Sequence, residues 1–475
     1  MREKDTTSPT VMVIFGITGD LSRKKLLPAL FDLEAAGLLP GKLRIIGFSR
    51  REWSSIEFIS YVRGVLAARE RQYHGELVEK FLKKFVYCQG LFADAHAYRR
   101  LGELIISIEK GAFKQCANKL YYLAVPPHFY EGIFRELALS GLTIPCGGDE
   151  GWARILVEKP FGNDVKTAKK LDELLGLLFK EEQIFRIDHY LAKEALQNLL
   201  AFRFSNALFE PVWNYKHIDK VFITLSETDT VGTRGEFYDS VGALKDVGQN
   251  HLLQMLGLIA MEPPKDVSGY AIRKERVQVL RALHGGVNPL AQYVMRGQYE
   301  GYKNEKGVDL KSTTETFFSV KAFVRNRRFR GVPFILTSGK ALGEAKTEIV
   351  VCFKPPHHCS CRAKQIRCMH ENTLTFRIQP NEGIDLRFWI KKPGFSNDLE
   401  EKHLSFSYAG SAEATRLPDA YERLLADALA GDQMLFTSTE EVQAAWRFIM
   451  PILKAWQNEP LVVYKKGTKG PVFEK

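Results

Sequence analysis

A chain of 475 residues with 45% apolar and 26% charged residues has the composition of an ordinary globular protein, and its length predicts two domains. This composition argues against disorder and against a coiled coil. The net charge of +11 is spread over small basic groups, with no basic tail and no nucleic-acid-binding motif, so it indicates a charged surface rather than nucleic acid binding.

The polar amino terminus and the scattered cysteines predict a cytoplasmic protein. Met1–Pro9 lacks the apolar core of a secretory signal. The longest apolar stretch, Leu252–Met261, is interrupted by Gln254 and is shorter than the roughly 20 residues that span a bilayer, so no membrane segment is expected. Seven cysteines without an export signal predict reduced thiols and no disulfides.

The first part of the chain, residues 1–187, is predicted to form a Rossmann-like domain. Short β-branched or aromatic runs alternate with helical patterns, which is typical of an α/β fold with a doubly wound parallel sheet. The expected strands are Thr10–Phe15, Leu43–Phe48, Phe85–Cys88, Lys119–Val125, Arg154–Glu158 and Gln183–Ile187. The expected helices are Leu26–Ala36, Ile56–Ala68, Ala95–Ile108, His128–Leu139 and Asp164–Phe179.

The remaining part, residues 188–475, is predicted to form an α+β domain with a large, mostly antiparallel sheet flanked by helices. A helical segment runs to about Ser205, and several later strands follow one another without helix-length spacers. The expected strands are Val221–Leu225, Phe317–Val324, Phe334–Thr337, Glu348–Phe353, Leu374–Gln379 and Asp385–Ile390. The expected helices are Asp246–Ala260, Ile272–Leu283, Tyr421–Ala430 and Glu440–Ala455.

A glycine-bearing turn follows the first expected strand. In Gly16-Ile17-Thr18-Gly19-Asp20 the backbone N–H groups can approach a pyrophosphate at a helix N-terminus, where the helix dipole favours negative charge. The spacing is Gly-x-x-Gly rather than Gly-x-Gly-x-x-Gly, so a purely conformational role of the glycines stays open.

Arg50 and Arg51 follow the second expected strand, where an NAD site usually has an acidic residue for the ribose hydroxyls. A guanidinium suits a 2′-phosphate instead, so the pattern favours NADP over NAD. Two surface arginines at the end of a strand are the alternative.

A second candidate site follows the strand expected at Gln183–Ile187. Asp188-His189-Tyr190, with Lys193 at the start of the next helix, brings a carboxylate, an imidazole, a phenol and an ammonium to the edge of the sheet where ligands bind. The last three can donate hydrogen bonds to a phosphate. The alternative is a capped helix start with surface residues.

His251 lies at the start of an apolar helix, five residues after Asp246. A lone histidine in such a helix is more often a hydrogen-bonded core residue. Oxidation of an alcohol by hydride transfer, however, needs a group that accepts the hydroxyl proton, and a histidine oriented by a carboxylate can do this without a metal.

These segments resemble the glucose-6-phosphate dehydrogenase family, in the same order and along nearly the whole chain. The motifs are Gly16–Lys25, Glu158–Gly162, Arg186–Glu194, Asp246–Leu256, Gly297–Tyr299, Val332–Leu336, Ser338–Leu342, Arg377–Glu382 and Pro418–Arg423. The resemblance implies oxidation of glucose 6-phosphate at C1 to 6-phosphogluconolactone with NADP, the first step of the oxidative pentose phosphate pathway. Three alternatives stay open: oxidation of another hexose phosphate, NAD as the hydride acceptor, and a non-catalytic regulator that binds a sugar phosphate or a nucleotide.

The resemblance also implies roles for single residues, and no metal. His251 would take the proton of the C1 hydroxyl, and Asp188 would orient its imidazole. The residues expected to bind substrate are Lys159, His189, Tyr190, Lys193, Glu227, Asp246 and Lys340. The residues expected to bind NADP are Gly16, Thr18, Gly19, Asp20, Lys25, Arg50, Tyr130 and Lys159. The family's assembly implies a homodimer or a dimer of dimers.

Four positions depart from the family's usual residues. Ala192 replaces a glycine, which we expect to be tolerated, and Lys245 replaces an arginine, which keeps the charge and loses the planar fork. Ala345 stands where an arginine near the substrate is common, so sugar preference can differ. Thr337 replaces an arginine that helps hold a second, structural NADP in eukaryotic members, which puts that site in doubt.

The segment His357–Cys361, with Cys368 and His370, carries side chains that can ligate zinc. Their spacing matches no standard zinc finger, and the segment lies between two expected strands, where the family has a variable loop. An exposed loop is therefore the favoured interpretation, and a metal site is the alternative.

Overall fold

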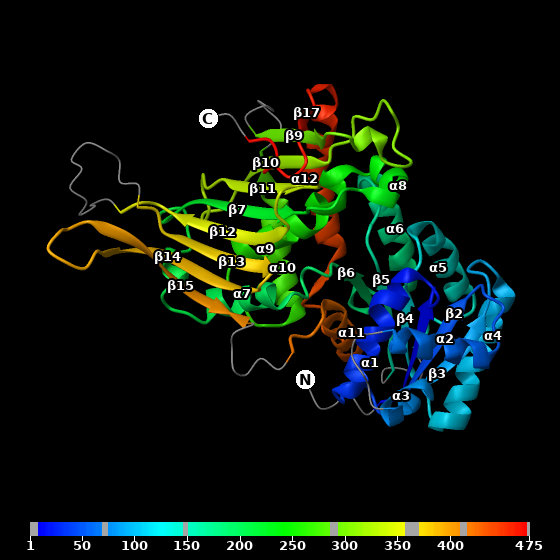
Figure 1. The fold of residues 1–475 in the computed structure, drawn as a ribbon. Helices are drawn as coiled ribbons and strands as arrows, with labels where there is room; N and C mark the ends of the chain where they lie inside the picture. The colour runs from blue at the N-terminus through cyan, green and yellow to red at the C-terminus, as the bar shows by residue number, and fades with distance from the viewer. Residues whose placement is uncertain are drawn as a thin grey trace.

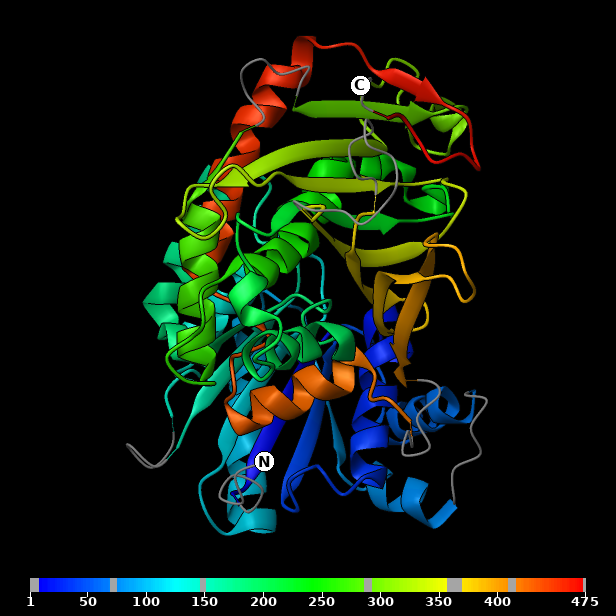
Figure 2. The ribbon, with the colours of Figure 1, turned by 90° about the vertical axis from the view of Figure 1, so that its left-hand side faces the viewer.

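The structure, a computed structural model, describes residues 8–68, 75–145, 151–285, 293–356, 370–408 and 416–472. A 7-stranded sheet comes mainly from the first part of the chain, and a 10-stranded sheet comes from the second part (Figure 1). In the turned view of Figure 2 the larger sheet occupies the upper half of the molecule and the smaller sheet the lower half. The predicted combination of an α/β and an α+β part is confirmed.

The smaller sheet has the strand order β16-β6-β5-β4-β1-β2-β3, and all neighbouring pairs are parallel except β16 with β6. Apart from β16, this is the doubly wound order of dinucleotide-binding sheets. The central strand β1 is buried along its whole length, which explains its uninterrupted apolar run. The strands are β1 (Thr10–Phe15), β2 (Leu43–Ser49), β3 (Phe85–Gln89), β4 (Asn118–Leu123), β5 (Ala153–Val157), β6 (Ile184–Ile187) and β16 (Phe436–Thr437).

The helices that connect these strands are α1 (Leu27–Ala35), α2 (Ser55–Ala67), α3 (Gly75–Leu82), α4 (Ala95–Ile108), α5 (Tyr130–Leu139) and α6 (Val165–Leu178). Capping boxes at Ser54 and Asp164 start α2 and α6. The helix expected from His128 begins as a 3-10 turn, Pro127–Phe129, before α5. The short helix α3 was not predicted, because eight residues give little helical periodicity.

The larger sheet has the order β15-β14-β13-β12-β7-β11-β10-β9-β17, with β8 paired to β10. It is mostly antiparallel, and its parallel pairs are β7 with β11 and β9 with β17. The strands β8, β9, β15 and β17 were not predicted; β15 is a largely exposed edge strand with the polar sequence LEEKHLSFS. The strands are β7 (Ile218–Ser226), β8 (Leu283–His284), β9 (Val294–Tyr299), β10 (Phe317–Val324), β11 (Phe334–Gly339), β12 (Lys346–Phe353), β13 (Thr373–Gln379), β14 (Gly383–Lys391), β15 (Leu399–Ser407) and β17 (Val462–Tyr464).

The helix expected over Asp246–Ala260 has two parts. The first is the π-helical segment η8 (Leu244–Leu252), and α9 (Leu253–Ala260) continues it. Such segments are frequent at functional sites, because the wider turn redirects side chains. The other helices are α7 (Glu194–Phe204), α8 (Gly235–Asp239), α10 (Gly269–Arg281), α11 (Ala420–Ala430) and α12 (Thr439–Ala455). In the described part of the chain, no helix is long and apolar enough to cross a membrane.

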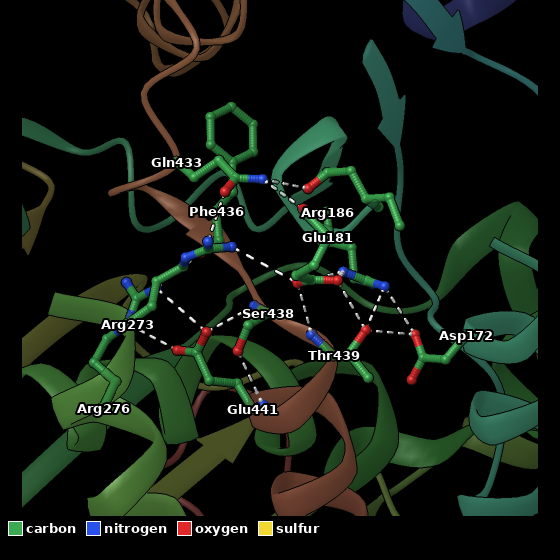
Figure 3. A network of polar contacts seen from close by, with 11 residues as sticks. Asp172, Glu181, Arg186, Arg273, Arg276, Gln433, Phe436, Ser438, Thr439 and Glu441 are labelled. Atoms are coloured by element: carbon green, nitrogen blue, oxygen red, sulfur yellow. Dashed lines mark hydrogen bonds and ion pairs between the residues drawn. The ribbon is translucent and has the colours of Figure 1, made fainter. Parts of the chain in front are cut away.

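A network of buried charged side chains joins the two parts of the molecule (Figure 3). Arg186 of β6 is 1% exposed and pairs with Asp172 and Glu181, each at 3.0 Å. Arg273 of α10 pairs with the same Glu181 at 3.7 Å and donates a hydrogen bond to Gln433 at 2.6 Å. Because Arg186, Asp172 and Arg273 are buried and all three are paired or hydrogen-bonded, they hold the end of β6 in place, and the partly exposed Glu181 links the two arginines.

The prediction that the cysteines are reduced is wrong for Cys116, which is disulfide-bonded. Cys88 and Cys352 are free and buried, as predicted. A disulfide needs two cysteines whose Cβ atoms approach within about 4 Å, and spacing along the chain does not reveal such a contact.

Candidate active site

The carboxyl end of the parallel sheet meets η8, and the two segments bring Asp188 and His251 into contact. Asp188 directly follows β6. Its Oδ1 atom is 2.5 Å from His251 Nδ1, and the two side chains are 2% and 3% exposed, respectively. Oδ1 also accepts a hydrogen bond from the backbone N–H of Tyr190 at 3.1 Å. Asp188 does not cap the next helix, because Lys193 is the N-cap of α7.

Burial and charge act in opposite directions on this pair. Burial alone would raise the pKa of Asp188, but His251, His189 and Lys159 together hold it below its ordinary value. Burial lowers the pKa of His251, and the Lys159 ammonium adds to this effect against the opposing influence of Asp188. The pair is therefore a carboxylate and a neutral imidazole. Because Nδ1 faces the carboxylate, the imidazole proton lies on Nδ1, and Nε2 is left as an acceptor.

Lys159, two residues after β5, lies on the other side of the imidazole. Its Nζ atom is 3.0 Å from His251 Nε2 and 3.0 Å from the backbone oxygen of Asp246. The Asp246 carboxylate is 3.6 Å from the same ammonium. Burial would raise the pKa of Asp246, but Lys159, Lys340 and Arg234 hold it below its ordinary value. Asp246 is therefore a charged acceptor next to the base.

His189, Tyr190 and Lys193 form a cluster of donors beside His251. The ring centroid of Tyr190 is 4.2 Å from that of His251, and the centroid of His189 is 4.8 Å from it. Burial, together with His251, lowers the pKa of His189 to about 3, so this imidazole is neutral. Burial raises the pKa of Tyr190 to about 12, so its hydroxyl stays protonated. Lys193 is partly exposed at the start of α7.

Glu227 and Lys340 directly follow the neighbouring strands β7 and β11. Because these strands are parallel, both side chains emerge at the same edge of the larger sheet. The Lys340 Nζ atom is 2.6 Å from Glu227 Oε2 and 5.4 Å from the ring centroid of Tyr238. The charge of Lys340 also lowers the pKa of Asp246, whose carboxylate is 3.6 Å from the Lys159 ammonium beside His251.

The glycine-bearing turn after β1 has the tight backbone that a pyrophosphate site needs. Gly16 has a φ of +82°, and a Cβ there would lie 2.4 Å from the Ala124 carbonyl oxygen, so only glycine fits. A Cβ on Gly19 would lie 3.1 Å from the Gly16 oxygen. The hydroxyl of Ser22 donates to that oxygen at 3.0 Å and ties the turn to the first helix. Thr18 is half-buried within the turn.

The other predicted cofactor residues differ in exposure. Asp20 and Lys25 are exposed and take part in surface ion pairs. Arg50 is exposed at the end of β2. Tyr130, in contrast, is 2% exposed, and its hydroxyl donates to the backbone oxygen of Glu158 at 3.1 Å. Tyr130 is therefore a packed, hydrogen-bonded residue in this structure, and its contact with the cofactor stays a prediction.

The positions that depart from the family lie in different environments. Ala192 is 3% exposed, so its methyl group is accommodated within the packing at the start of α7. Lys245 and Thr337 are half-buried, and Ala345 is exposed. The segment predicted to be an exposed loop, with zinc ligation as the alternative, lies outside the described residues at 357–369, and of its candidate ligands only His370 is described. Among the residues that the structure describes, no group of three or more His, Cys, Asp or Glu side chains is arranged to hold a metal.

One residue at this site received no predicted role. Glu158 directly precedes Lys159 and is partly buried, and the Tyr122 hydroxyl donates to its carboxylate at 2.6 Å. Burial raises its pKa to about 7. The motif Glu158–Gly162 indicated that this segment belongs to the site, but nothing in its spacing relates Glu158 to tyrosines elsewhere in the chain.

Two profiles of known families match the chain and together span nearly all of it. The profile described as "Glucose-6-phosphate dehydrogenase, NAD binding domain" matches residues 13–198. The profile described as "Glucose-6-phosphate dehydrogenase, C-terminal domain" matches residues 200–475. The domain boundary between residues 187 and 188 stays a prediction.

Known proteins are also similar to this chain over nearly its whole length. The chain is 42% identical to glucose-6-phosphate 1-dehydrogenase of Aggregatibacter actinomycetemcomitans over 478 residues, which covers 97% of this chain and 94% of the relative. It is 40% identical to glucose-6-phosphate 1-dehydrogenase 2 of Mycobacterium tuberculosis over 477 residues, covering 98% and 91%. A solved glucose-6-phosphate dehydrogenase in complex with its substrate glucose 6-phosphate superimposes with a TM-score of 0.89 at 34% identity, covering 98% of this chain and 96% of that one. The resemblance predicted from the motifs is confirmed, and the chain belongs to the glucose-6-phosphate dehydrogenase family.

Proposed function

We propose that this protein oxidises glucose 6-phosphate at C1 to 6-phosphogluconolactone and transfers the hydride to NADP. The observation that carries the proposal is the arrangement of Asp188, His251 and Lys159. A buried carboxylate lies 2.5 Å from Nδ1 of a neutral imidazole, whose Nε2 atom lies 3.0 Å from an ammonium. Membership of the family supports the reaction class, and these side chains supply the proton acceptor that the reaction needs.

The reaction breaks a C–H bond and an O–H bond at C1. The hydroxyl proton goes to Nε2 of His251, and the imidazolium that forms is stabilised by the adjacent carboxylate of Asp188. The Lys159 ammonium donates to Nε2 in this structure, and the C1 hydroxyl would take over this donor position when substrate binds. NADP, when bound, accepts the hydride at C4 of its nicotinamide.

The substrate phosphate is assigned to His189, Tyr190 and Lys193. The low pKa of His189 reflects burial and the neighbouring His251, and a phosphate dianion would favour the charged form of this imidazole. The Tyr190 hydroxyl and the Lys193 ammonium add two more donors. We assign Glu227, Asp246 and Lys340 to the sugar hydroxyls, because carboxylates and an ammonium together satisfy both donors and acceptors.

We further propose that the nicotinamide dinucleotide is NADP rather than NAD. The turn carries no Cβ atom at Gly16 and Gly19, where one would meet backbone oxygens, and a pyrophosphate site needs such close backbone approach. Arg50 is exposed at the end of β2, and the Arg51 guanidinium lies 5.0 Å from the ring centroid of Trp53. An exposed guanidinium in this position suits a 2′-phosphate. A homodimer or dimer of dimers and a cytoplasmic location stay predictions.

A matrix of substrates and cofactors tests the proposal. Glucose 6-phosphate, two other hexose 6-phosphates and free glucose are each combined with NADP and with NAD, and the absorbance of the reduced nicotinamide is followed. We expect reduction of NADP with glucose 6-phosphate and none with free glucose, because the phosphate ligands would be unused. A preference for another sugar phosphate or for NAD would replace that part of the proposal, and no reduction in any combination would contradict it.

A further inference from the structure

The carboxyl group of Glu158 lies between two tyrosine hydroxyls at the edge of the active site. Tyr122 of β4 donates a hydrogen bond to Glu158 Oε1 at 2.6 Å. Tyr421 of α11 lies near the same carboxyl group, and its hydroxyl also lowers the pKa of Glu158. The hydroxyl of Tyr130, from α5, donates to the backbone oxygen of Glu158 at 3.1 Å. Side chains from three different elements therefore hold both the backbone and the side chain of this residue.

Glu158 is connected to the active site in two directions. Lys159 follows it in the chain, and its ammonium is 3.0 Å from Nε2 of His251. In the other direction, the Tyr421 ring is stacked against His189, with ring centroids 6.4 Å apart and an interplanar angle of 14°. A displacement of the Glu158 carboxyl would therefore shift Lys159 relative to His251, the proposed base. It would also shift Tyr421 relative to His189, a predicted phosphate ligand.

We propose that Glu158 is a positioning residue for the reaction, whose carboxylate holds Lys159 against His251 and the Tyr421 ring against His189. This inference rests on the proposed roles of His251 and His189, through which Glu158 acts. A carboxylate can accept hydrogen bonds from both tyrosine hydroxyls at once, whereas a protonated carboxyl must donate its own proton and loses part of this capacity.

The groups that face Glu158 make its charge sensitive to pH near neutrality. Burial raises its pKa to about 7, against the opposing effects of the Tyr122 and Tyr421 hydroxyls and of the Lys159 ammonium, and the Asp188 carboxylate adds to the increase. Burial also raises the pKa of both tyrosines, so these hydroxyls remain donors. The carboxyl is therefore protonated below neutral pH and charged above it.

Glu158→Gln keeps the shape of the side chain and removes its charge at every pH. We expect kcat to fall about tenfold at about pH 8.5, where the native carboxyl is charged, and about twofold or less at about pH 6, where it is protonated as well. The KM for NADP should stay within about twofold. An equal fall at both pH values, as a purely structural role would give, or no fall at either, overturns the proposal.

Two further variants separate positioning from stability. Tyr122→Phe removes one hydrogen bond to the carboxyl and should lower kcat about threefold. Tyr121→Phe is the matched control, because its hydroxyl, on the same strand, bonds the Leu142 carbonyl at 2.7 Å, and it should leave kcat unchanged. An equal loss of kcat in both variants contradicts the proposal.

Variants at Tyr421 and His251 complete the test. If Glu158→Gln does not fold, Tyr421→Phe retains the ring against His189 and loses the hydroxyl, and it should lower kcat about threefold, more at high pH than at low pH. A Tyr421→Phe variant with unchanged kcat overturns the proposal. His251→Asn tests the proposed base separately: retained turnover there would overturn that assignment and the role of Glu158 that rests on it, whereas lost turnover leaves the Glu158 and tyrosine variants to decide the positioning role alone.

Discussion

The two ends of the candidate active site are built differently. At the catalytic end, Asp188 and His251 are almost fully buried and 2.5 Å apart. At the dinucleotide end, Asp20, Lys25 and Arg50 are exposed, whereas the glycine-bearing turn and Tyr130 are constrained by close packing. A buried pair holds its geometry before a ligand arrives, whereas an exposed charge is screened by water and gains a defined geometry only with its ligand. A substitution should therefore cost far more at the catalytic end.

The largest expected effect is that of His251→Asn. The variant keeps a polar side chain that can bond Asp188 but removes the proton acceptor, so kcat should fall by about a thousandfold. Steady-state kinetics with glucose 6-phosphate and NADP measure this. His217→Asn, an exposed histidine in the loop before β7, is the matched control and should leave kcat unchanged. Near-normal turnover of His251→Asn would mean that another group takes the proton.

A smaller effect is expected from Arg50→Ser at the dinucleotide end. Loss of the guanidinium should raise the KM for NADP about tenfold, equivalent to about 1.4 kcal/mol, while the KM for NAD stays unchanged because NAD has no 2′-phosphate. Arg135→Ser, which removes an exposed arginine from α5, should change neither KM. Equal losses with both cofactors would remove Arg50 from the proposed 2′-phosphate site.

Lys159→Gln lies at the catalytic end and should also lower kcat, but the effect of interest, the smallest of the three, is a shift of the pH profile. The base must be neutral, so kcat/KM should fall as the pH drops through the pKa of His251, which burial and the Lys159 ammonium hold below its ordinary value. Removing the ammonium raises that pKa, so the acidic limb should move to higher pH, by up to about one unit. If the acidic limb of the kcat/KM profile stays at the same pH and only the value of kcat/KM changes, the role of Lys159 is limited to substrate binding.

Much of the parallel sheet was predictable, because its strands are buried on both faces and read as apolar runs, as Thr10–Phe15 does. The strand β15 was not, because an exposed edge strand does not need alternating apolar residues. The conformation of η8 could not be predicted either, since π-helical segments are rare and this one continues directly into the ordinary helix α9. The disulfide at Cys116 depends on a spatial contact that the spacing of cysteines does not encode.

The sequence by itself determined the family, the order of the motifs and the kinds of side chain available for proton, phosphate and dinucleotide chemistry, because these depend on local patterns. From the residues alone, Asp188 and His251 belonged to two separate clusters, 63 positions apart. The family resemblance implied that Asp188 orients His251, but only the tertiary structure showed that both side chains are buried and that Glu158 lies between two tyrosines. Burial and three-dimensional proximity determine which carboxylate is charged and which imidazole is neutral, and neither quantity is local in the chain.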